Sequence, residues 1–130
     1  MSKRPFEMIL FRQLAGHLPL PVFLVDTAGT LIFYNEAAEQ VLGRRFDETG
    51  EMTAPEWSSV FIPRDERGES LPSSALPLSI ALAEKRPAHK RFEIRGLDGV
   101  LRHIELTALP LHSLDGTFHG AVAIFWETAS

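Results

Sequence analysis

Five histidines and the absence of cysteine limit the chemistry that this chain of 130 residues can do. The histidines are His17, His89, His103, His112 and His119, and none belongs to an H-E-x-x-H or His-x-His arrangement. Without cysteine, the chain has no disulfide, no thiolate nucleophile and no zinc site built on cysteine. We predict that the histidines are dispersed over the surface and the sheet faces and that no metal is bound.

Carboxylates are the other groups that could do acid-base chemistry, and each has a structural explanation. Asp26 falls in a predicted turn, and Glu36 and Glu39 lie on the exposed side of a predicted helix. Glu93 and Glu105 alternate with apolar residues in predicted strands. The sequence also lacks a G-x-S-x-G elbow and a glycine-rich phosphate loop. We therefore predict that the protein is not an enzyme.

Composition excludes two classes of partner. A net charge of −4 gives no electrostatic footprint for nucleic acid, which needs a clustered basic face. The sequence has no run of about eighteen apolar residues, so we predict no membrane span. The first residues lead to no small-residue cleavage site, which favours a cytoplasmic location. The length and the hydrophobic fraction of 45% fit one globular domain.

A hairpin followed by a helix is the clearest local signal. Two apolar runs, Val22–Val25 and Leu31–Tyr34, flank a turn that contains Gly29. Asn35 is a good N-cap because its side-chain oxygen can accept a helical N–H, and Gly43 suits a helix end at positive φ.

The other predicted elements follow from periodicity and from the positions of proline and glycine. Apolar spacing predicts amphipathic helices over Pro5–Leu18 and Ser74–Arg86, and Arg44–Pro72 is expected to be irregular apart from a helical turn around Trp57. Three further strands are predicted over Ala88–Arg95, Val100–Leu111 and Phe118–Trp126.

These motifs together resemble PAS domains. The D-x-x-G turn of Asp26–Gly29 and the N-x-A-A-x-x-x-x-G helix of Asn35–Gly43 match the opening of that family, and Gly68–Pro72 followed by Pro77-Leu78 matches its middle. The resemblance implies an α+β fold, with a five-stranded antiparallel sheet, helices on one face and an N-terminal flanking helix. Residues 1–19 would be an amphipathic helix for dimerisation or capping, and residues 20–128 the PAS domain.

In function, the resemblance implies a sensory or protein-interaction module in signal transduction or transcriptional regulation. Such a module would be a homodimer, would pass its signal to an effector domain or protein partner, and would bind a small apolar ligand in its core. A flavin adduct through cysteine is excluded because the chain has no cysteine. Haem is disfavoured, because the Ser74–Arg86 helix has no histidine and His89 lies beyond it. The cofactor is otherwise unknown.

Alternation along the strands and apolar spacing along the helices give a set of candidate residues for each role. The expected cavity lining is Leu31, Phe33, Trp57, Phe61, Leu78, Leu82, Ile104, Leu106, Val122 and Ile124. The expected dimer interface on the N-terminal helix is Phe6, Ile9, Leu10 and Leu14. The opposite face of the sheet is expected to carry Leu101, Leu109, Ala121, Ala123 and Phe125 and to need a cover.

Two alternatives stay open. A ligand-free dimerisation module would show the same apolar residues, because a packed core and a ligand cavity need the same side chains. A small α+β cone enzyme resembling ketosteroid isomerase has a similar length, but it would need long helices before its sheet and an acid in its pocket.

Overall fold

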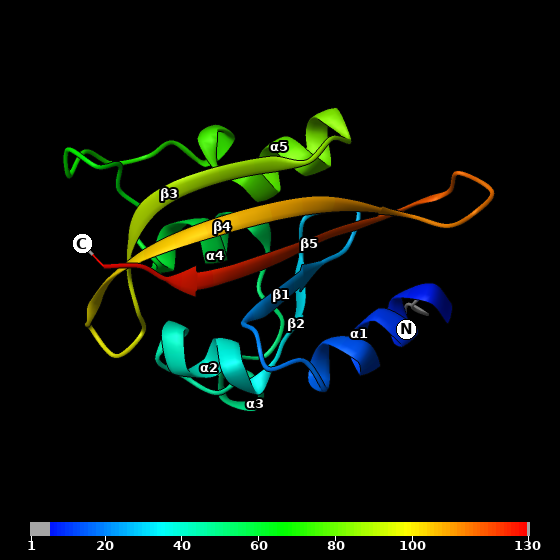
Figure 1. Ribbon diagram of the computed structural model, residues 1–130, viewed down its shortest axis with the longest axis horizontal. Coiled ribbons are helices and arrows are strands. Elements are labelled where there is room, and N and C mark those ends of the chain that lie inside the picture. The colour runs from blue at the N-terminus through cyan, green and yellow to red at the C-terminus, as the bar shows by residue number, and fades with distance from the viewer. Residues whose placement is uncertain (1–5, 130) are drawn as a thin grey trace.

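The computed structural model describes residues 6–129, and its centre is one antiparallel sheet of five strands. The strands are β1 (Val22–Val25), β2 (Leu31–Tyr34), β3 (Ala88–Arg95), β4 (Leu101–His112) and β5 (Phe118–Glu127). They lie in the order β2-β1-β5-β4-β3, so the chain crosses the sheet between β2 and β3 (Figure 1). The predicted α+β fold with a five-stranded antiparallel sheet is confirmed.

The crossing between β2 and β3 carries the helices that cover one face, which we call the inner face. These are α2 (Glu36–Leu42), α3 (Phe46–Thr49), α4 (Ala54–Val60), the 3-10 turn η1 (Ser73–Ala75) and α5 (Pro77–Glu84). In Figure 1, α4 and α5 lie behind the strands. The helix α1 (Phe6–Gly16) lies apart from these helices, at the lower right. The predicted start of the first helix at Pro5 lies outside the described residues.

The helix predicted over Ser74–Arg86 is divided by Leu76. This residue has ψ 140° and separates η1 from α5. The cause is Pro77, because the ring of a proline excludes the helical conformation from the residue before it. The short helix α3 was not predicted and lies inside a segment expected to be irregular. At its start the Arg45 N–H donates to the Glu48 carboxylate at 3.3 Å.

Asn35 joins α1 to the rest of the fold, and its predicted N-cap role is confirmed. Its Oδ1 accepts hydrogen bonds from the N–H groups of Ala38 and Val22, each at 3.0 Å. Its Nδ2 donates to the carbonyls of Ala15 and Leu20, each at 2.8 Å. The residue is 1% exposed. One buried amide therefore caps α2, accepts a hydrogen bond from the first residue of β1 and donates one to the end of α1.

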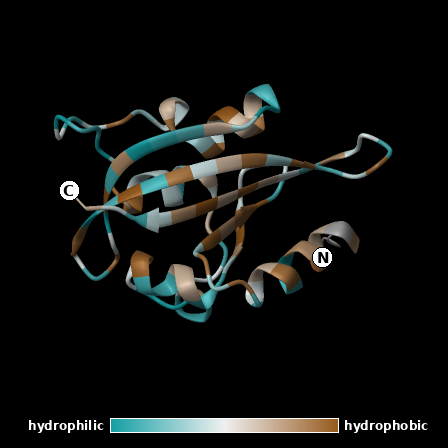
Figure 2. Ribbon diagram, viewed as in Figure 1, coloured by the Kyte–Doolittle hydropathy of each residue, from teal (hydrophilic) through white to brown (hydrophobic). Residues whose placement is uncertain are grey.

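Apolar side chains form one cluster on each face of the sheet. The large inner cluster contains Phe23, Tyr34, Trp57 and Phe125. The small cluster on the opposite face, the outer face, is Met8 of α1 with Leu24 and Ile32. Figure 2 shows that β1 is hydrophobic along its length, whereas β3 is largely hydrophilic. The flanking position predicted for the N-terminal helix is therefore confirmed, and α1 covers the β1–β2 side of the outer face.

The predicted orientation of β5 is wrong. Ala121, Ala123 and Phe125 belong to the inner cluster, and Val122 packs on the outer one. Ile124 pairs with Val22 in the register that puts Phe23 opposite Ala123. Two of these inner positions are alanines, and they pair with Val25 and Phe23 of β1. Of the residues expected on the outer face, Leu101 and Leu109 do lie on it.

The prediction for Phe33 is also wrong, and a β-bulge is the reason. The β1–β2 register shifts between Leu24 and Val25, so that Phe23 pairs with Tyr34 while Val25 pairs with Leu31. An extra residue in one strand breaks the simple alternation of faces. Leu31 and Tyr34 therefore both point inward, and Phe33 packs with the outer cluster.

Candidate functional site

The inner face holds a partly open cavity of about 60 Å³. Each helix or strand that meets there contributes side chains, from Phe23 of β1 to Phe125 of β5. The full lining is Phe23, Leu42, Trp57, Phe61, Pro63, Leu76, Pro77, Leu78, Phe92, Ile94, Ile104, Leu106 and Phe125. All of these residues are largely buried, and the cavity that they line is partly open rather than sealed.

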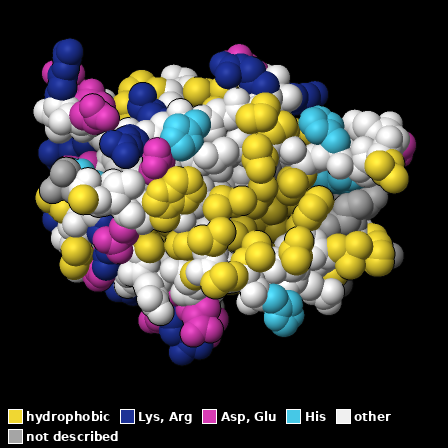
Figure 3. Space-filling view, viewed as in Figure 1, with side chains coloured by type: hydrophobic (Ala, Val, Ile, Leu, Met, Phe, Trp, Pro, Cys, Tyr) yellow, Lys and Arg dark blue, Asp and Glu magenta, His cyan; other side chains and the backbone are white. Residues whose placement is uncertain are grey.

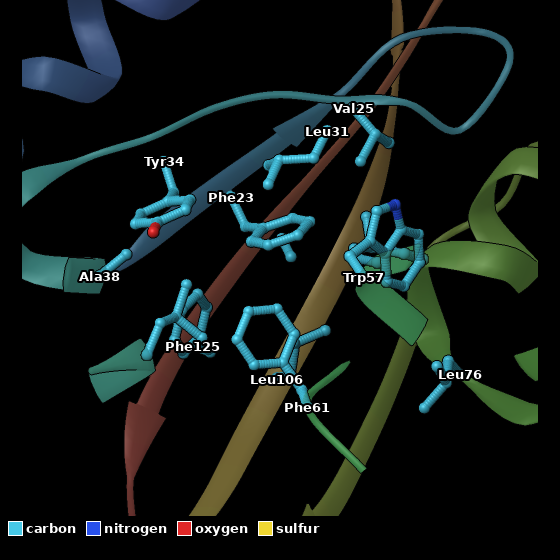
Figure 4. Close-up of a cluster of buried hydrophobic side chains, with 14 of the residues drawn as sticks. Phe23, Val25, Leu31, Tyr34, Ala38, Trp57, Phe61, Leu76, Leu106 and Phe125 are labelled. Atoms are coloured by element: carbon cyan, nitrogen blue, oxygen red, sulfur yellow. The ribbon is translucent and has the colours of Figure 1, made fainter. Parts of the chain in front are cut away.

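Aromatic rings make up much of the wall. The Phe23 ring meets Trp57 edge to face, with centroids 5.7 Å apart, and meets Phe61 in the same way at 6.5 Å. On its other side it stacks on Tyr34 at 6.2 Å. Figure 4 shows these rings converging on Leu106 and Phe125. Edge-to-face contacts of this kind stabilise a specific arrangement of rings, so the cavity has a defined shape.

The polar atoms near the cavity are already hydrogen bonded. The indole Nε1 of Trp57 donates to the Gly29 carbonyl at 2.7 Å. The Tyr34 hydroxyl donates to the Arg44 carbonyl at 2.8 Å, and its burial raises the pKa of this phenol. No lining side chain carries a charge. The cavity therefore offers a ligand dispersion contacts and burial of apolar surface, without charge recognition.

Five of the ten residues predicted to line a cavity do line it: Trp57, Phe61, Leu78, Ile104 and Leu106. Leu31 and Leu82 pack in the same core without reaching the cavity. Phe33, Val122 and Ile124 lie on the other face for the reasons given above. The candidate lining did not include Phe125, which the prediction placed outside. It also left out Phe23, Leu42, Pro63, Leu76, Pro77, Phe92 and Ile94.

The histidines and carboxylates do not assemble into a reactive site. His89 contacts Glu105 at 3.1 Å and Thr107 at 2.7 Å, and His103 lies 3.9 Å from Glu93. These pairs lie across β3 and β4, and the His89 hydrogen bond lowers the pKa of Glu105. Within residues 6–129, no three His, Asp or Glu side chains are grouped so that they could hold a metal ion.

The outer face is only partly covered. Phe6, Ile9, Leu10 and Leu14 of α1 are 65%, 47%, 49% and 59% exposed. Figure 3 shows hydrophobic side chains gathered across the middle of this view, over β5 and toward α1. The Phe125 N–H donates to the Pro21 carbonyl at 3.1 Å, which brings the backbone of Leu20 beside that of Trp126. Both side chains are exposed, at 46% and 39%.

One side chain fixes α1 against the sheet from outside. The Arg12 guanidinium lies 4.9 Å from the centroid of the Phe33 ring and 5.8 Å from that of Phe46. Cation–π contacts of this kind hold α1 against β2 and α3. Together with the Asn35 hydrogen bonds, they give α1 a fixed place while its apolar ridge stays exposed.

Comparison with known proteins agrees with this architecture. A family model described as the PAS fold matches residues 16–130. No curated protein matches the sequence. Along the described chain, no helix has the length and apolar character needed to cross a membrane.

Solved structures share the fold at low sequence identity. The PAS domain of BvgS from Bordetella pertussis is 16% identical, with 95% of this chain and 87% of that one covered and a TM-score of 0.63. The PAS domain of nitrogen regulation protein NR(II) from Vibrio parahaemolyticus is 15% identical, with 92% and 98% covered and a TM-score of 0.62. The LOV protein of Rhodobacter sphaeroides is 12% identical, with 96% and 69% covered and a TM-score of 0.74.

Proposed function

Because this chain belongs to the PAS family, whose members are sensory domains of signalling proteins, we propose that it senses a small apolar molecule and acts as a homodimer. The observation that carries the proposal is the cavity of about 60 Å³ with an apolar lining at the centre of the fold. An effector domain or protein partner would receive the signal. The cytoplasmic location and the absence of enzymatic activity, both predicted from the sequence, are part of the same proposal.

The size and the lining of the cavity define the class of ligand. An apolar cavity of about 150 Å³ stays dry and takes benzene or xenon. The smaller cavity here, of about 60 Å³, suits an uncharged molecule of a few heavy atoms. A carboxylate or an ammonium group would be buried without a charged partner, at a high cost in free energy.

Exposed apolar residues support the homodimer. Phe6, Ile9, Leu10 and Leu14 form a ridge on α1, and Leu20 and Trp126 extend the exposed apolar surface along the sheet. Apolar patches of this kind mark interaction sites in soluble proteins. A second copy would cover the same residues on both subunits, as a two-fold interface requires.

A ligand-free dimerisation module is the second candidate, and the small volume of the cavity favours it. A void of this size also occurs in cores that hold only side chains. The two candidates share the dimer and differ in the occupant of the cavity.

Native mass spectrometry of freshly isolated protein at several concentrations, with gas chromatography of an organic extract, separates these candidates. The proposed sensor gives twice the mass of the chain and releases one small uncharged molecule. A doubled mass with an empty extract supports the ligand-free module. A single-chain mass at every concentration contradicts the homodimer.

A further inference from the structure

The strand β3 forms one edge of the sheet, and the chain itself covers only part of that edge (Figure 1). Arg64 and Glu93 exchange two main-chain hydrogen bonds of 2.9 Å, and the Arg95 N–H donates to the Phe61 carbonyl at 2.8 Å. A turn over Asp65–Gly68 then leads the chain away, with its closing hydrogen bond at 3.0 Å. The cover of the edge therefore reaches Glu93 and ends there.

His89 and Arg91 lie on the part of the edge beyond this cover. Alternate residues of a strand point their N–H and C=O groups to the same side, so those of His89 and Arg91 point away from β4, as those of Glu93 do. Within residues 6–129, these groups have no partner in the main chain. Both side chains lean back over β4, since His89 Nε2 lies 3.1 Å and Arg91 Nε 3.5 Å from the Glu105 carboxylate. The edge itself is thus left open.

The open edge is basic. Five basic side chains lie on it or just before it: Lys85, Arg86, His89, Lys90 and Arg91. The acids paired with them are Glu84, which lies 2.8 Å from Arg86, and Glu105. This excess of basic groups stands in a chain whose net charge is −4. Charge and hydrogen-bonding capacity together favour an acidic partner at this edge.

The same charges disfavour a second copy of β3. Two such edges pairing side by side would bring the bases of one strand opposite those of the other, and like charges opposite one another destabilise a strand pair. An extended segment that carries Asp or Glu meets no such repulsion. Asp65 and Glu66 line the same groove as Arg91, so the acids of this segment are expected beside His89 and Lys90.

We propose that the edge over His89–Arg91 binds an extended acidic segment of a partner protein, which adds a strand to the sheet. The main-chain groups of the segment would bond with those of His89 and Arg91, and its carboxylates would pair with the basic side chains. The inference goes beyond the proposed sensor and homodimer, because it uses neither the cavity nor α1. Its failure would leave both of those proposals as they stand.

A pair of peptides tests strand addition on the natural protein. The probe is a heptapeptide of alternating glutamate and valine, blocked at both ends, and its matched control is the same peptide N-methylated at every residue. The control keeps the charge and loses every N–H donor. Fluorescence anisotropy measures both affinities, and NMR measures deuterium exchange of the His89 and Arg91 amides.

We expect the unmodified peptide to bind roughly tenfold more tightly than the methylated one, or tighter still, because strand addition needs its N–H groups. The His89 and Arg91 amides should exchange more slowly in its presence. Equal affinities of the two peptides would overturn strand addition, and equal binding of a lysine-valine peptide would overturn the preference for acids. If oligothymidylate binds more tightly than the peptide and leaves both amides unprotected, the edge is a nucleic-acid site and the proposal is wrong.

Arg91→Pro and Arg91→Ala are a matched pair of variants. Both remove the guanidinium, but only proline removes the N–H that points away from β4, and proline is tolerated on edge strands. We expect the proline variant to bind the glutamate-valine peptide roughly fivefold more weakly than the alanine variant. Equal binding by the two variants would show that this N–H is not used. The peptide pair needs no variant, so it decides the proposal even if the proline variant does not fold.

Discussion

The two faces of the sheet bury their apolar side chains in different ways. Four helices and a 3-10 turn cover the inner face and enclose aromatic rings around a small cavity. On the outer face, α1 covers only the β1–β2 side, and β3 and β4 carry charged pairs such as His89–Glu105 and Arg91–Glu105. On the outer face, exposed apolar surface lies between α1 and the charged pairs of β3 and β4. The comparison shows that one chain covers its own inner face, whereas its outer face keeps exposed apolar surface, which the proposed homodimer would bury.

The largest effect is expected where adjacent residues lie on opposite faces. Phe125 is 2% exposed in the inner cluster and Trp126 is 39% exposed on the outer face. Phe125→Ala should lower the free energy of unfolding by about 3–5 kcal/mol, and Trp126→Ala by about 1 kcal/mol or less. Urea unfolding at concentrations that favour the monomer measures both. Equal losses would mean that the two faces are buried alike.

Charges on the α1 ridge should disrupt the outer interface without affecting the inner core. Ile9→Glu with Leu10→Glu places two like charges at half-exposed positions, and it should weaken self-association roughly a hundredfold. Gln13→Glu, at an exposed polar site on the same helix, is the control for added charge. Sedimentation velocity measures the association, and a double variant that associates as tightly as the natural protein contradicts the ridge as the interface.

Asn35 links the two regions, and two substitutions separate its roles. Asn35→Ala loses the cap and the bonds to α1 and should lower the free energy of unfolding by about 2 kcal/mol. Asn35→Asp keeps the oxygen that caps α2 but loses the donors to Ala15 and Leu20. Hydrogen exchange should therefore rise in α1 for both variants and in α2 only for alanine. Unchanged exchange in α1 would mean that the Asn35 hydrogen bonds do not hold that helix.

The smallest effect concerns pH. The Arg102 guanidinium, 2.8 Å from Asp98, lowers the pKa of this carboxyl from 3.8 to about 2. Because the folded-state pKa is the lower one, the carboxylate stabilises the fold above pH 3.8, and that contribution is lost as the pH falls through about 2. Asp98→Asn should flatten the loss of stability in this window. An identical pH profile of unfolding for the variant would contradict this assignment.

Local chemistry in the sequence predicted much of the fold. The hairpin strands, the Asn35 cap and the Gly43 helix end depend on neighbouring residues, and the structure has them at the predicted positions. The break at Leu76 between η1 and α5 was also encoded locally, by the proline that follows it.

Packing between distant segments was not predictable in the same way. The inward orientation of Ala121 and Ala123 depends on Phe23 and Val25 of a neighbouring strand. The bulge in β2 reversed Phe33 with no turn residue to mark it. A cavity is the volume that packed side chains leave unfilled, so the composition of the core cannot predict it.

The central claim is that the inner face binds a ligand while the outer face associates, and the two tryptophans report on one face each. Trp57 lines the cavity and Trp126 lies on the outer face. The measurement is the NMR spectrum of the two indole N–H groups, first during titration with xenon and then during dilution of the protein. We predict that xenon shifts the Trp57 signal alone and that dilution shifts the Trp126 signal alone. If saturating xenon leaves Trp57 unmoved, or if dilution leaves Trp126 unmoved, the corresponding half of the account is contradicted.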